Sequence, residues 1–342
     1  MEKTLGTPRL PIFDLHCDTL DRLGWPLLAD DLNGGETSYA PDDKGKVSAG
    51  TLQDFATSRG HLSLRGMAGF VWCQCLAVFV PDYLTVEQSA RFFQTIAGTV
   101  PAHLEAHGDL LAMARTAEQI DEVLGSGRSC GVLTIENGKL LATSADMIER
   151  IAQLGVRMVT LTWNAENPLG SGNETQHGLT SFGRAMVRAL EARKIVVDVS
   201  HLNDPGFWDV EACARRPFVA SHSNARAICA HPRNLTDDQF RAIRDAGGVV
   251  GLNYFNEFVT EGSGEYEPAE LLAHVEHWLD LDGEDVVALG SDYDGCDVPE
   301  WLNPCSKLAG LVELFQHHFG EDIARKLCFQ NAYDLFRRID AE

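Results

Sequence analysis

The sequence predicts a single (β/α)8 barrel spanning residues 1–342, with a polar insertion after the first strand. Two observations predict this fold. Eight runs with the apolar composition of β-strands are spaced along the chain, and residues with helical periodicity lie between them. Several of the runs are almost continuously apolar, as are strands buried on both faces of a parallel sheet. Strands that alternate with helices in this way build α/β folds, and 342 residues suit one barrel with insertions.

The expected strands follow one another at intervals that leave room for a helix between most of them. They are Leu10–His16, Phe70–Phe79, Cys130–Glu136, Arg157–Trp163, Ile195–His201, Pro217–His222, Gly248–Tyr254 and Val286–Asp292. Apolar residues at helical spacing predict helices over 182–193, 236–246 and 323–339. The second of these helices opens on Thr236 and stops at two glycines, which are strong start and stop signals.

The segment 29–51 departs from this alternation because it is rich in Asp, Gly, Pro and Ser. It predicts a long polar loop after the first strand, either a rim of the active face or a solvated insertion. The alternative fold is a doubly wound open sheet. No glycine-rich phosphate-binding motif follows the first strand, which weakens that alternative.

Composition excludes several classes of protein. Lys and Arg number 28 against 50 Asp and Glu, a net charge of −22, which argues against nucleic acid or an anionic membrane as partner. The nine cysteines form no short-spaced framework and indicate reduced thiols. Residues 1–9 lack a signal-peptide pattern, and no apolar run approaches the ~18 residues of a membrane span. We therefore expect a cytoplasmic protein without a membrane anchor.

Five of the eight expected strands finish on or just before histidines or acidic residues. These residues are His16, Asp18, Glu136, His201, His222 and Asp292. The carboxyl ends of barrel strands converge on one mouth, so we expect these side chains to meet there. Imidazole and carboxylate ligands suit Zn²⁺, Mn²⁺ or Fe²⁺. Three histidines and three acids exceed the needs of one ion, and a binuclear site with a bridging carboxylate fits the count better.

The chain resembles the membrane (renal) dipeptidases, peptidase family M19 of the amidohydrolase superfamily, from about Leu10 to Ile339. The resemblance rests on Asp14–Leu20, Leu161–Asn164, Gly178–Gly183, Val197–Leu202, Ser221–Arg226, His231–Asn234, Gly247–Asn253 and Gly290–Gly295. It implies a barrel of the metallo-dependent hydrolase type in which two zinc ions serve the cleavage of dipeptides.

The resemblance also implies a set of metal ligands. His16 and Asp18 would bind one zinc ion, Glu136 would bridge both ions, and His201 and His222 would bind the second. A hydroxide bridging the two metals would then attack the substrate carbonyl carbon.

Two further roles concern the substrate. Asp292 would act as general base and acid, and Arg233 would bind the free carboxylate, a natural partner for a planar guanidinium. The family accepts a D-residue at the C-terminal position, so L-Xaa-D-Xaa dipeptides such as L-Ala-D-Ala are expected. Members of the family often dimerise, which makes a homodimer one expected state.

The sequence departs from the mammalian members at two positions. Trp163 stands where they have a histidine thought to polarise the scissile carbonyl, and Phe258 stands where they have a tyrosine near the substrate. Losing an oxyanion donor can cost roughly 10²–10³ in rate. We favour the metal as the polarising group, with Trp163 and His177 as substrate-contacting candidates and Asn164 as another donor.

The sequence is compatible with two alternative functions, and it predicts structural roles for several histidine, lysine and cysteine residues. The alternatives are a binuclear amidohydrolase acting on another small amide or lactone, and a metal-binding protein without catalysis. We expect the histidine pair His274 and His277 to lie on the outer face of a helix, and Lys139 to be structural. We expect Cys73 and Cys75, which share one face of a strand, to pack.

Overall fold

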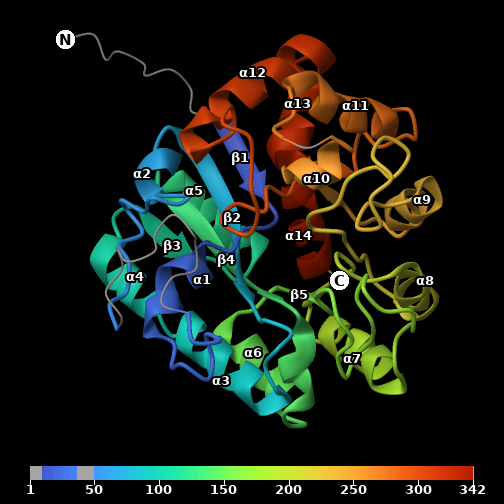
Figure 1. Ribbon diagram of the computed structural model, residues 1–342. Helices are drawn as coiled ribbons and strands as arrows, with labels where there is room; N and C mark the ends of the chain where they lie inside the picture. Colours follow the sequence, from blue (N-terminus) through green and yellow to red (C-terminus); the bar gives the residue numbers. More distant parts are fainter. Residues whose placement is uncertain (1–9, 37–49, 263, 342) are drawn as a thin grey trace.

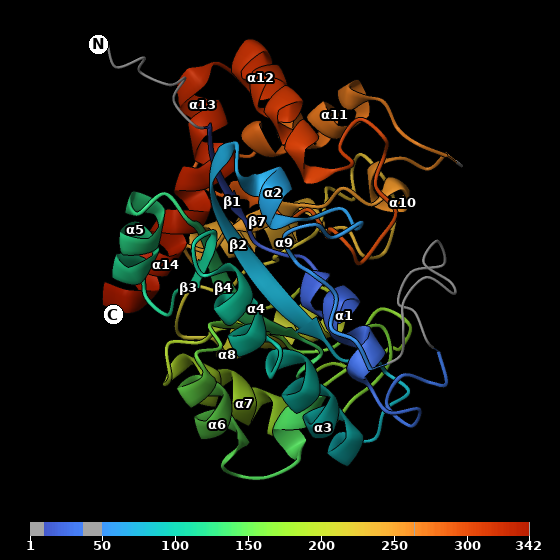
Figure 2. The same cartoon turned by 90° about the vertical axis from the view of Figure 1, so that its left-hand side faces the viewer.

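The computed structural model describes residues 10–36, 50–262 and 264–341, so part of the expected polar loop, 37–49, lies outside the described residues. Seven parallel strands form a curled sheet in the order β6-β5-β4-β2-β1-β8-β7, and β3 pairs beside β4 (Figure 1). The strands are β1 (Leu10–Asp14), β2 (Phe70–Phe79), β3 (Leu111–Met113), β4 (Ser129–Glu136), β5 (Met158–Thr160), β6 (Val196–Asp198), β7 (Val250–Leu252) and β8 (Val287–Leu289). β2 is the longest strand and crosses the middle of the view in Figure 2.

The expected strand at 217–222 is present only as two single-residue bridges. Val219 pairs with Asp198 at the end of β6, and Ala220 pairs with Val250 in β7, both in parallel. The segment therefore contacts both edge strands of the sheet without forming a strand of its own.

Side-chain acceptors explain why the pairing stops after two residues. The N–H of Ser221 donates to Asp198 Oδ1 at 2.9 Å, and the N–H of His222 donates to Ser200 Oγ at 3.2 Å. These two groups are unavailable to a strand ladder, and Pro217 has no N–H to offer. The prediction of a strand here was wrong because the N–H groups at the end of the run donate to side chains and not to a neighbouring strand.

Helices follow most of the strands. They are α1 (Thr19–Gly24), α2 (Leu64–Met67), α3 (Val86–Ala97), α4 (Val100–His107), α5 (Ala117–Gly125), α6 (Met147–Leu154), α7 (Ser181–Glu191), α8 (Asp204–Cys213), α9 (Asp237–Asp245), α10 (Asn256–Val259), α11 (Pro268–Leu279), α12 (Leu308–Phe319), α13 (Glu321–Arg325) and α14 (Asn331–Ala341). Thr236 caps α9 with a capping box, as its start signal predicts. The expected helix at 323–339 is interrupted by a π-helical turn, Lys326–Gln330. None of the helices in the described ranges has the length and apolar character that a membrane span requires.

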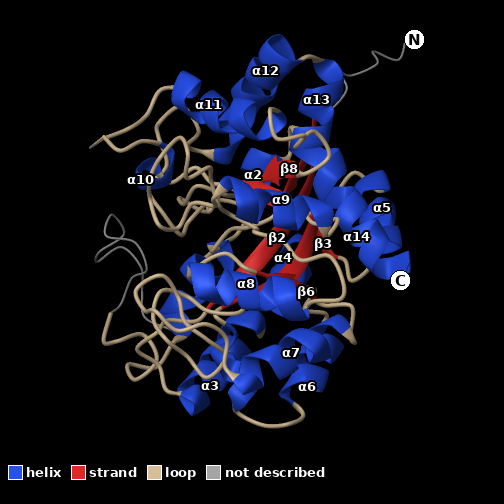
Figure 3. Cartoon of the chain, turned by 90° about the vertical axis from the view of Figure 1, so that its right-hand side faces the viewer, coloured by secondary structure: helices blue, strands red, loops and turns tan. Residues whose placement is uncertain are grey.

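The loops gather on one side of the molecule, on the left in Figure 3. Apolar side chains fill the space between strands and helices. One cluster joins strand residues, Cys73 and Cys75 among them, to α5 and α14, and includes Phe13 stacked on Phe336 with ring centroids 5.4 Å apart. The two thiols are fully buried, as packing residues should be. Lys139 is also structural, since its Nζ donates to the backbone oxygens of Asp82 and Leu84.

The sequence predicted His274 on the outer face of a helix, and this was wrong. The residue lies in α11, and its side chain is buried. Its Nδ1 accepts the N–H of Ala225 at 3.1 Å, and its Nε2 lies 3.0 Å from the carbonyl oxygen of Val259. Burial lowers the pKa of His274 from its usual 6.5 to about 4. The folded state therefore holds this ring neutral, which makes stability sensitive to acid.

We expect the His274→Asn variant to lose less stability in acid than the unchanged protein. Between pH 6.5 and about 4 the unfolded chain binds a proton at His274 and the folded chain does not, so stability falls as pH falls. Urea unfolding at pH 7.5 and pH 5 measures the loss. It should be smaller by about 2 kcal/mol in the variant. An equal loss in both proteins would contradict a neutral, buried His274.

Candidate metal centre and active site

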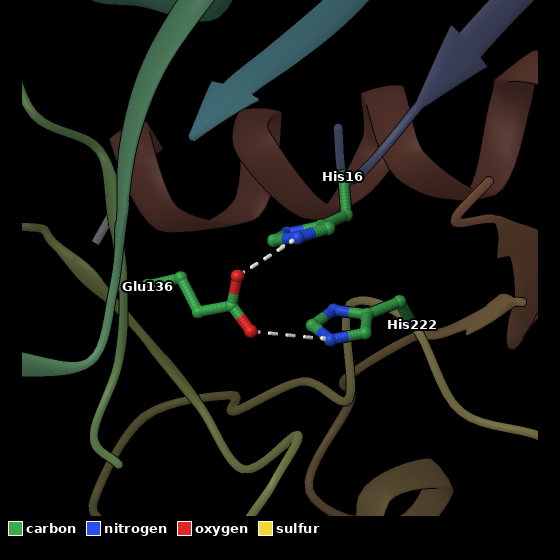
Figure 4. Close-up of side chains that lie close together, drawn as sticks. All are labelled: His16, Glu136 and His222. Carbon is green, nitrogen blue, oxygen red and sulfur yellow. Dashed lines mark ion pairs between the residues drawn. The ribbon is translucent and has the colours of Figure 1, made fainter. Parts of the chain in front are cut away.

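The carboxylate of Glu136 lies at the centre of the site, at the end of β4. Its Oε2 lies 3.3 Å from His16 Nε2, and its Oε1 lies 2.6 Å from His201 Nε2 and 3.7 Å from His222 Nε2. Figure 4 shows His16 and His222 directed at the two oxygens of this one carboxylate. All four side chains are buried. The fold thus brings together residues that are up to 206 positions apart in the sequence.

Two more acids complete this group on the side of β1 and β8. His16 Nε2 lies 3.7 Å from Asp18 Oδ2 and 3.8 Å from Asp292 Oδ1. The donor atoms fall into two sets that share His16, one with Glu136 and His222 and one with Asp18 and Asp292. Asp292 is therefore as close to His16 as Asp18 is.

The donor atoms fit divalent cations. The Nε2 atoms of His201 and His222 face each other at 3.0 Å, although two imidazole nitrogens with lone pairs repel. Among the described residues, His16 Nε2 and Asp18 Oδ1 are buried without a hydrogen-bond partner. Buried polar atoms are normally paired, and nitrogen and carboxylate atoms converging in this way form the ligand set of zinc-type ions.

The pKa shifts at the site come from burial and from the charges of neighbouring groups. Burial, with a smaller contribution from Asp18, raises the pKa of Glu136 to about 7. Burial lowers the pKa of His201 well below its usual value, with Arg233 adding to the effect. Burial also opposes a charge on His16, but Glu136 and Asp18 outweigh it and raise its pKa well above normal. Added positive charge would favour the ionised carboxylates and neutral rings that metal binding needs.

A cavity of ≈ 970 Å³ opens over this group, and Arg233, Trp163 and Asp292 all line it. Arg233 is buried, with Nη1 3.4 Å from Ser223 Oγ, Nη2 3.3 Å from the carbonyl oxygen of His222, and Nε unpaired. Its guanidinium lies 5.2 Å from the centre of the Phe258 ring. Burial lowers its pKa to about 10, so it stays charged at neutral pH.

The candidates for replacing the missing histidine are placed differently. The Trp163 ring packs edge-on against Phe79 with centroids 4.9 Å apart, in the cavity wall. Asn164 Oδ1 lies 3.0 Å from His201 Nδ1, so this residue orients a ring. His177 is not brought to the site: its exposed side chain pairs with Glu166 at 3.2 Å, and it is not among the cavity residues.

Sequence reasoning missed three polar residues of the cavity region. Asn253 Nδ2 donates to Asp292 Oδ2 at 3.1 Å. Asp294 accepts the N–H of His61 at 2.7 Å and lines the cavity with it. Asn253 and Asp294 lie within the motif stretches, which could have singled them out, whereas His61 lies in a loop with no motif.

Several strand-end residues have left-handed backbone. His201 has φ 69°, Asp292 φ 61° and Asp294 φ 67°. Residues other than glycine adopt this backbone conformation at a cost of order 1–3 kcal/mol, and such residues tend to cluster at functional sites. The backbone at these turns directs the side chains toward the shared cavity.

We expect Gly295→Ala to disrupt the Asp18 side of the site. A Cβ atom at Gly295 would lie 1.9 Å from Asp18 Oδ2 and 2.5 Å from Asp292 Oδ1, so both carboxylates would have to move. Metal content should fall by about one ion per chain, with activity falling at least tenfold. Gly310→Ala is a matched control, because a Cβ there meets nothing within 4 Å. Full metal content in Gly295→Ala would contradict this arrangement.

A curled parallel sheet whose strand ends gather histidines and carboxylates defines a metal-dependent hydrolase site. Comparison with known proteins gives the family. The family described as membrane dipeptidase, peptidase family M19, matches residues 7–341. The chain therefore belongs to this family, and it is an enzyme of the metallo-dipeptidase type.

Two solved structures resemble the chain over nearly its whole length. One is a metallo peptidase from Rhodobacter sphaeroides liganded with a phosphinate mimic of the dipeptide L-Ala-D-Ala, with 29% identity, a TM-score of 0.83, and coverage of 97% of this chain and 99% of that one. The other is a dipeptidase of family M19, with 30% identity, a TM-score of 0.83, and coverage of 96% and 98%. An uncharacterized protein in the pqqA 5' region of Klebsiella pneumoniae is 39% identical over 54% of this chain and 73% of its own length.

Proposed function

We propose that the protein is a zinc-dependent dipeptidase that hydrolyses short dipeptides, with L-Xaa-D-Xaa substrates such as L-Ala-D-Ala. The observation that carries the proposal is the convergence of His16, Asp18, Glu136, His201 and His222 below a cavity whose wall holds a buried arginine. The phosphinate mimic bound by the similar Rhodobacter sphaeroides peptidase supports the substrate class.

In this proposal the five residues hold two zinc ions. His16 and Asp18 would hold one, His201 and His222 the other, and the carboxylate of Glu136, which faces both sides, would bridge them. Zinc bound there would supply Lewis acidity, which polarises a carbonyl group and makes water acidic enough to attack at neutral pH. No imidazole from the Trp163 position or from His177 is then needed for polarisation.

Asp292 moves the protons in the proposed reaction. Its Oδ2 is held by Asn253 at 3.1 Å, while its Oδ1 faces His16 and the cavity. A carboxylate held by one oxygen keeps the other in a fixed position. It would take a proton from the attacking water and pass it to the leaving amine.

Arg233 would bind the free carboxylate of the dipeptide. Its Nε has no partner in the part of the chain that the structure describes, its two Nη contacts are long, and the Phe258 ring lies against the guanidinium. A buried guanidinium with unused donors favours a planar anion. Fixing the carboxylate close to the metal ligands limits the substrate to a single peptide bond.

The proposal also covers the domain organisation of the chain and the closure of its sheet. We infer that the chain is one domain, a closed barrel in which 217–222 stands in the place of the eighth strand. Its bridges to both β6 and β7 support this. Cytoplasmic location and a homodimer stay predictions.

The test is a hydrolysis screen of zinc-loaded protein with matched L-Xaa-L-Xaa and L-Xaa-D-Xaa dipeptides, with metal content measured on the same sample. Cleavage with about two metals per chain is expected, and the ratio between the two sets defines stereochemical preference. Two metals without cleavage would redirect the proposal to an amidohydrolase of other small amides or lactones. Absence of metal uptake would overturn the site.

A further inference from the structure

We propose that Asp198 and Ser221 are positioning residues for the metal centre: together they fix the tautomer of His222 so that Nε2 is the nitrogen left free for a metal. The inference rests on the proposed role of His222 as a zinc ligand. Neither Asp198 nor Ser221 is among the residues that line the cavity. Both act from behind the ligands.

Asp198 is fully buried at the end of β6 and receives four hydrogen bonds. Its Oδ1 accepts the N–H of Ser200 at 3.0 Å and the N–H of Ser221 at 2.9 Å. Its Oδ2 accepts the hydroxyls of Thr160 at 2.5 Å and Ser221 at 2.6 Å. Ionised carboxylates only accept, so all four protons must come from these neighbours.

The count of protons then fixes the ring of His222. Ser221 has one hydroxyl proton, and Asp198 takes it. Ser221 Oγ also lies 2.7 Å from His222 Nδ1, and this contact is a hydrogen bond only if the ring nitrogen donates. His222 therefore carries its proton on Nδ1, and Nε2 keeps its lone pair.

The free nitrogen lies where a ligand is needed. His222 Nε2 is 3.0 Å from His201 Nε2 and 3.7 Å from Glu136 Oε1. Histidine ligands usually donate their other N–H to a carboxylate or carbonyl group, which orients the ring and sets its tautomer. Here a serine hydroxyl stands between the carboxylate and the ring.

Asp198 also holds the backbone of both ligand segments. The two N–H groups on its Oδ1 belong to Ser200 and Ser221, the residues directly before His201 and His222. One buried carboxylate thus anchors the end of β6 and the 217–222 segment, which carry ligands to the same proposed zinc ion. Removing it should loosen both rings at once.

A second buried carboxylate gives an internal comparison. Asp14, at the end of β1, accepts the hydroxyl of Ser291 at 2.5 Å and its N–H at 2.8 Å. Ser291 Oγ then lies 3.1 Å from the carbonyl oxygen of His16, not from a ring nitrogen. Asp14 Oδ2 also accepts from the Gln74 amide at 3.0 Å, so this pair bonds backbone groups and an amide, whereas the Asp198–Ser221 pair reaches an imidazole.

The experiment compares Ser221→Ala with Thr160→Val. Each variant removes one hydroxyl group that donates to Oδ2 of Asp198. Only the Ser221 hydroxyl also contacts His222. Zinc affinity is measured by competition with a chromophoric chelator, together with metal content and thermal unfolding. We expect Ser221→Ala to weaken binding of one of two zinc ions by about 10–100-fold. Thr160→Val should bind both within about twofold of the unchanged protein.

Two outcomes would overturn the inference: unchanged zinc affinity in Ser221→Ala, or equal losses in both variants. If the unchanged protein binds no zinc, the proposed function itself fails. An independent readout is the ¹⁵N NMR signature of His222 in zinc-free protein, expected to show Nδ1–H. In Asp198→Asn an amide N–H directed at Ser221 would turn the serine proton toward the ring, and the signature should change to Nε2–H. An Nε2–H ring in the unchanged protein would contradict the proposal.

Discussion

Replacing Asp292 by asparagine should lower kcat for dipeptide hydrolysis by about 10²–10⁴-fold while the metal content stays unchanged. An amide cannot take a proton from water, but asparagine tolerates the left-handed backbone found at this position. Steady-state kinetics and metal analysis on one preparation measure both quantities. The two measurements together distinguish a general base from a metal ligand. Both roles have to be considered because the carboxylate of Asp292 lies close enough to His16 for the two residues to bind one metal ion.

The matched control is Asp282→Asn. Asp282 has φ 60° and an exposed side chain, so the same substitution is made in the same conformation away from the site. Its activity should stay within about twofold of the unchanged enzyme. Loss of one metal ion in Asp292→Asn would identify Asp292 as a ligand and not the base.

Arg233→Met should lower kcat/KM for dipeptides with a free carboxylate by roughly 100-fold or more. The variant loses two charge-assisted hydrogen bonds to the substrate, each about 1.5–3 kcal/mol. Dipeptide amides, which lack the carboxylate, should be hydrolysed equally by the variant and the unchanged enzyme. Kinetics on the acid and amide of one dipeptide therefore isolate the interaction.

Arg241→Met is the control for this variant, because Arg241 lies partly exposed on α9, outside the cavity residues, and pairs with Asp237 and Asp238 of the same helix. Arg233→Lys separates charge from geometry, since an ammonium cannot form the planar pair. Equal loss on acid and amide would show that Arg233 does not read the carboxylate. That outcome would favour an amidohydrolase with another substrate.

Long apolar strands were the part of the fold that the sequence predicted best. Phe70–Phe79 is reproduced at both ends, and the strand expected from Cys130 begins one residue earlier. β3, Leu111–Met113, was missed because its short apolar run lies in the brief connection between two helices, α4 and α5. The 217–222 segment has the composition of a strand, but its last N–H groups bond side chains that composition does not locate.

The residues of the site likewise divide into those that the sequence predicted and those that it did not. Strand ends predict convergence because the fold dictates where they meet, and this located the histidines and acids around Glu136. His177 was misplaced because it lies on a loop whose path no local pattern determines. The bonds from Asn253 to Asp292 and from Asn164 to His201 depend on amide orientation, which spacing does not encode. Position along a strand is therefore more predictable than the contacts of a loop.

The left-handed residues around the cavity have a consequence for engineering. Glycine at His201, Asp292 or Asp294 would relax the backbone by about 1 kcal/mol or more, yet each change would remove a side chain from the cavity. Selection for heat resistance alone would therefore reward inactive variants. Asp282 has the same backbone conformation, is exposed and lies outside the cavity residues, so glycine there should raise thermal tolerance without touching the chemistry.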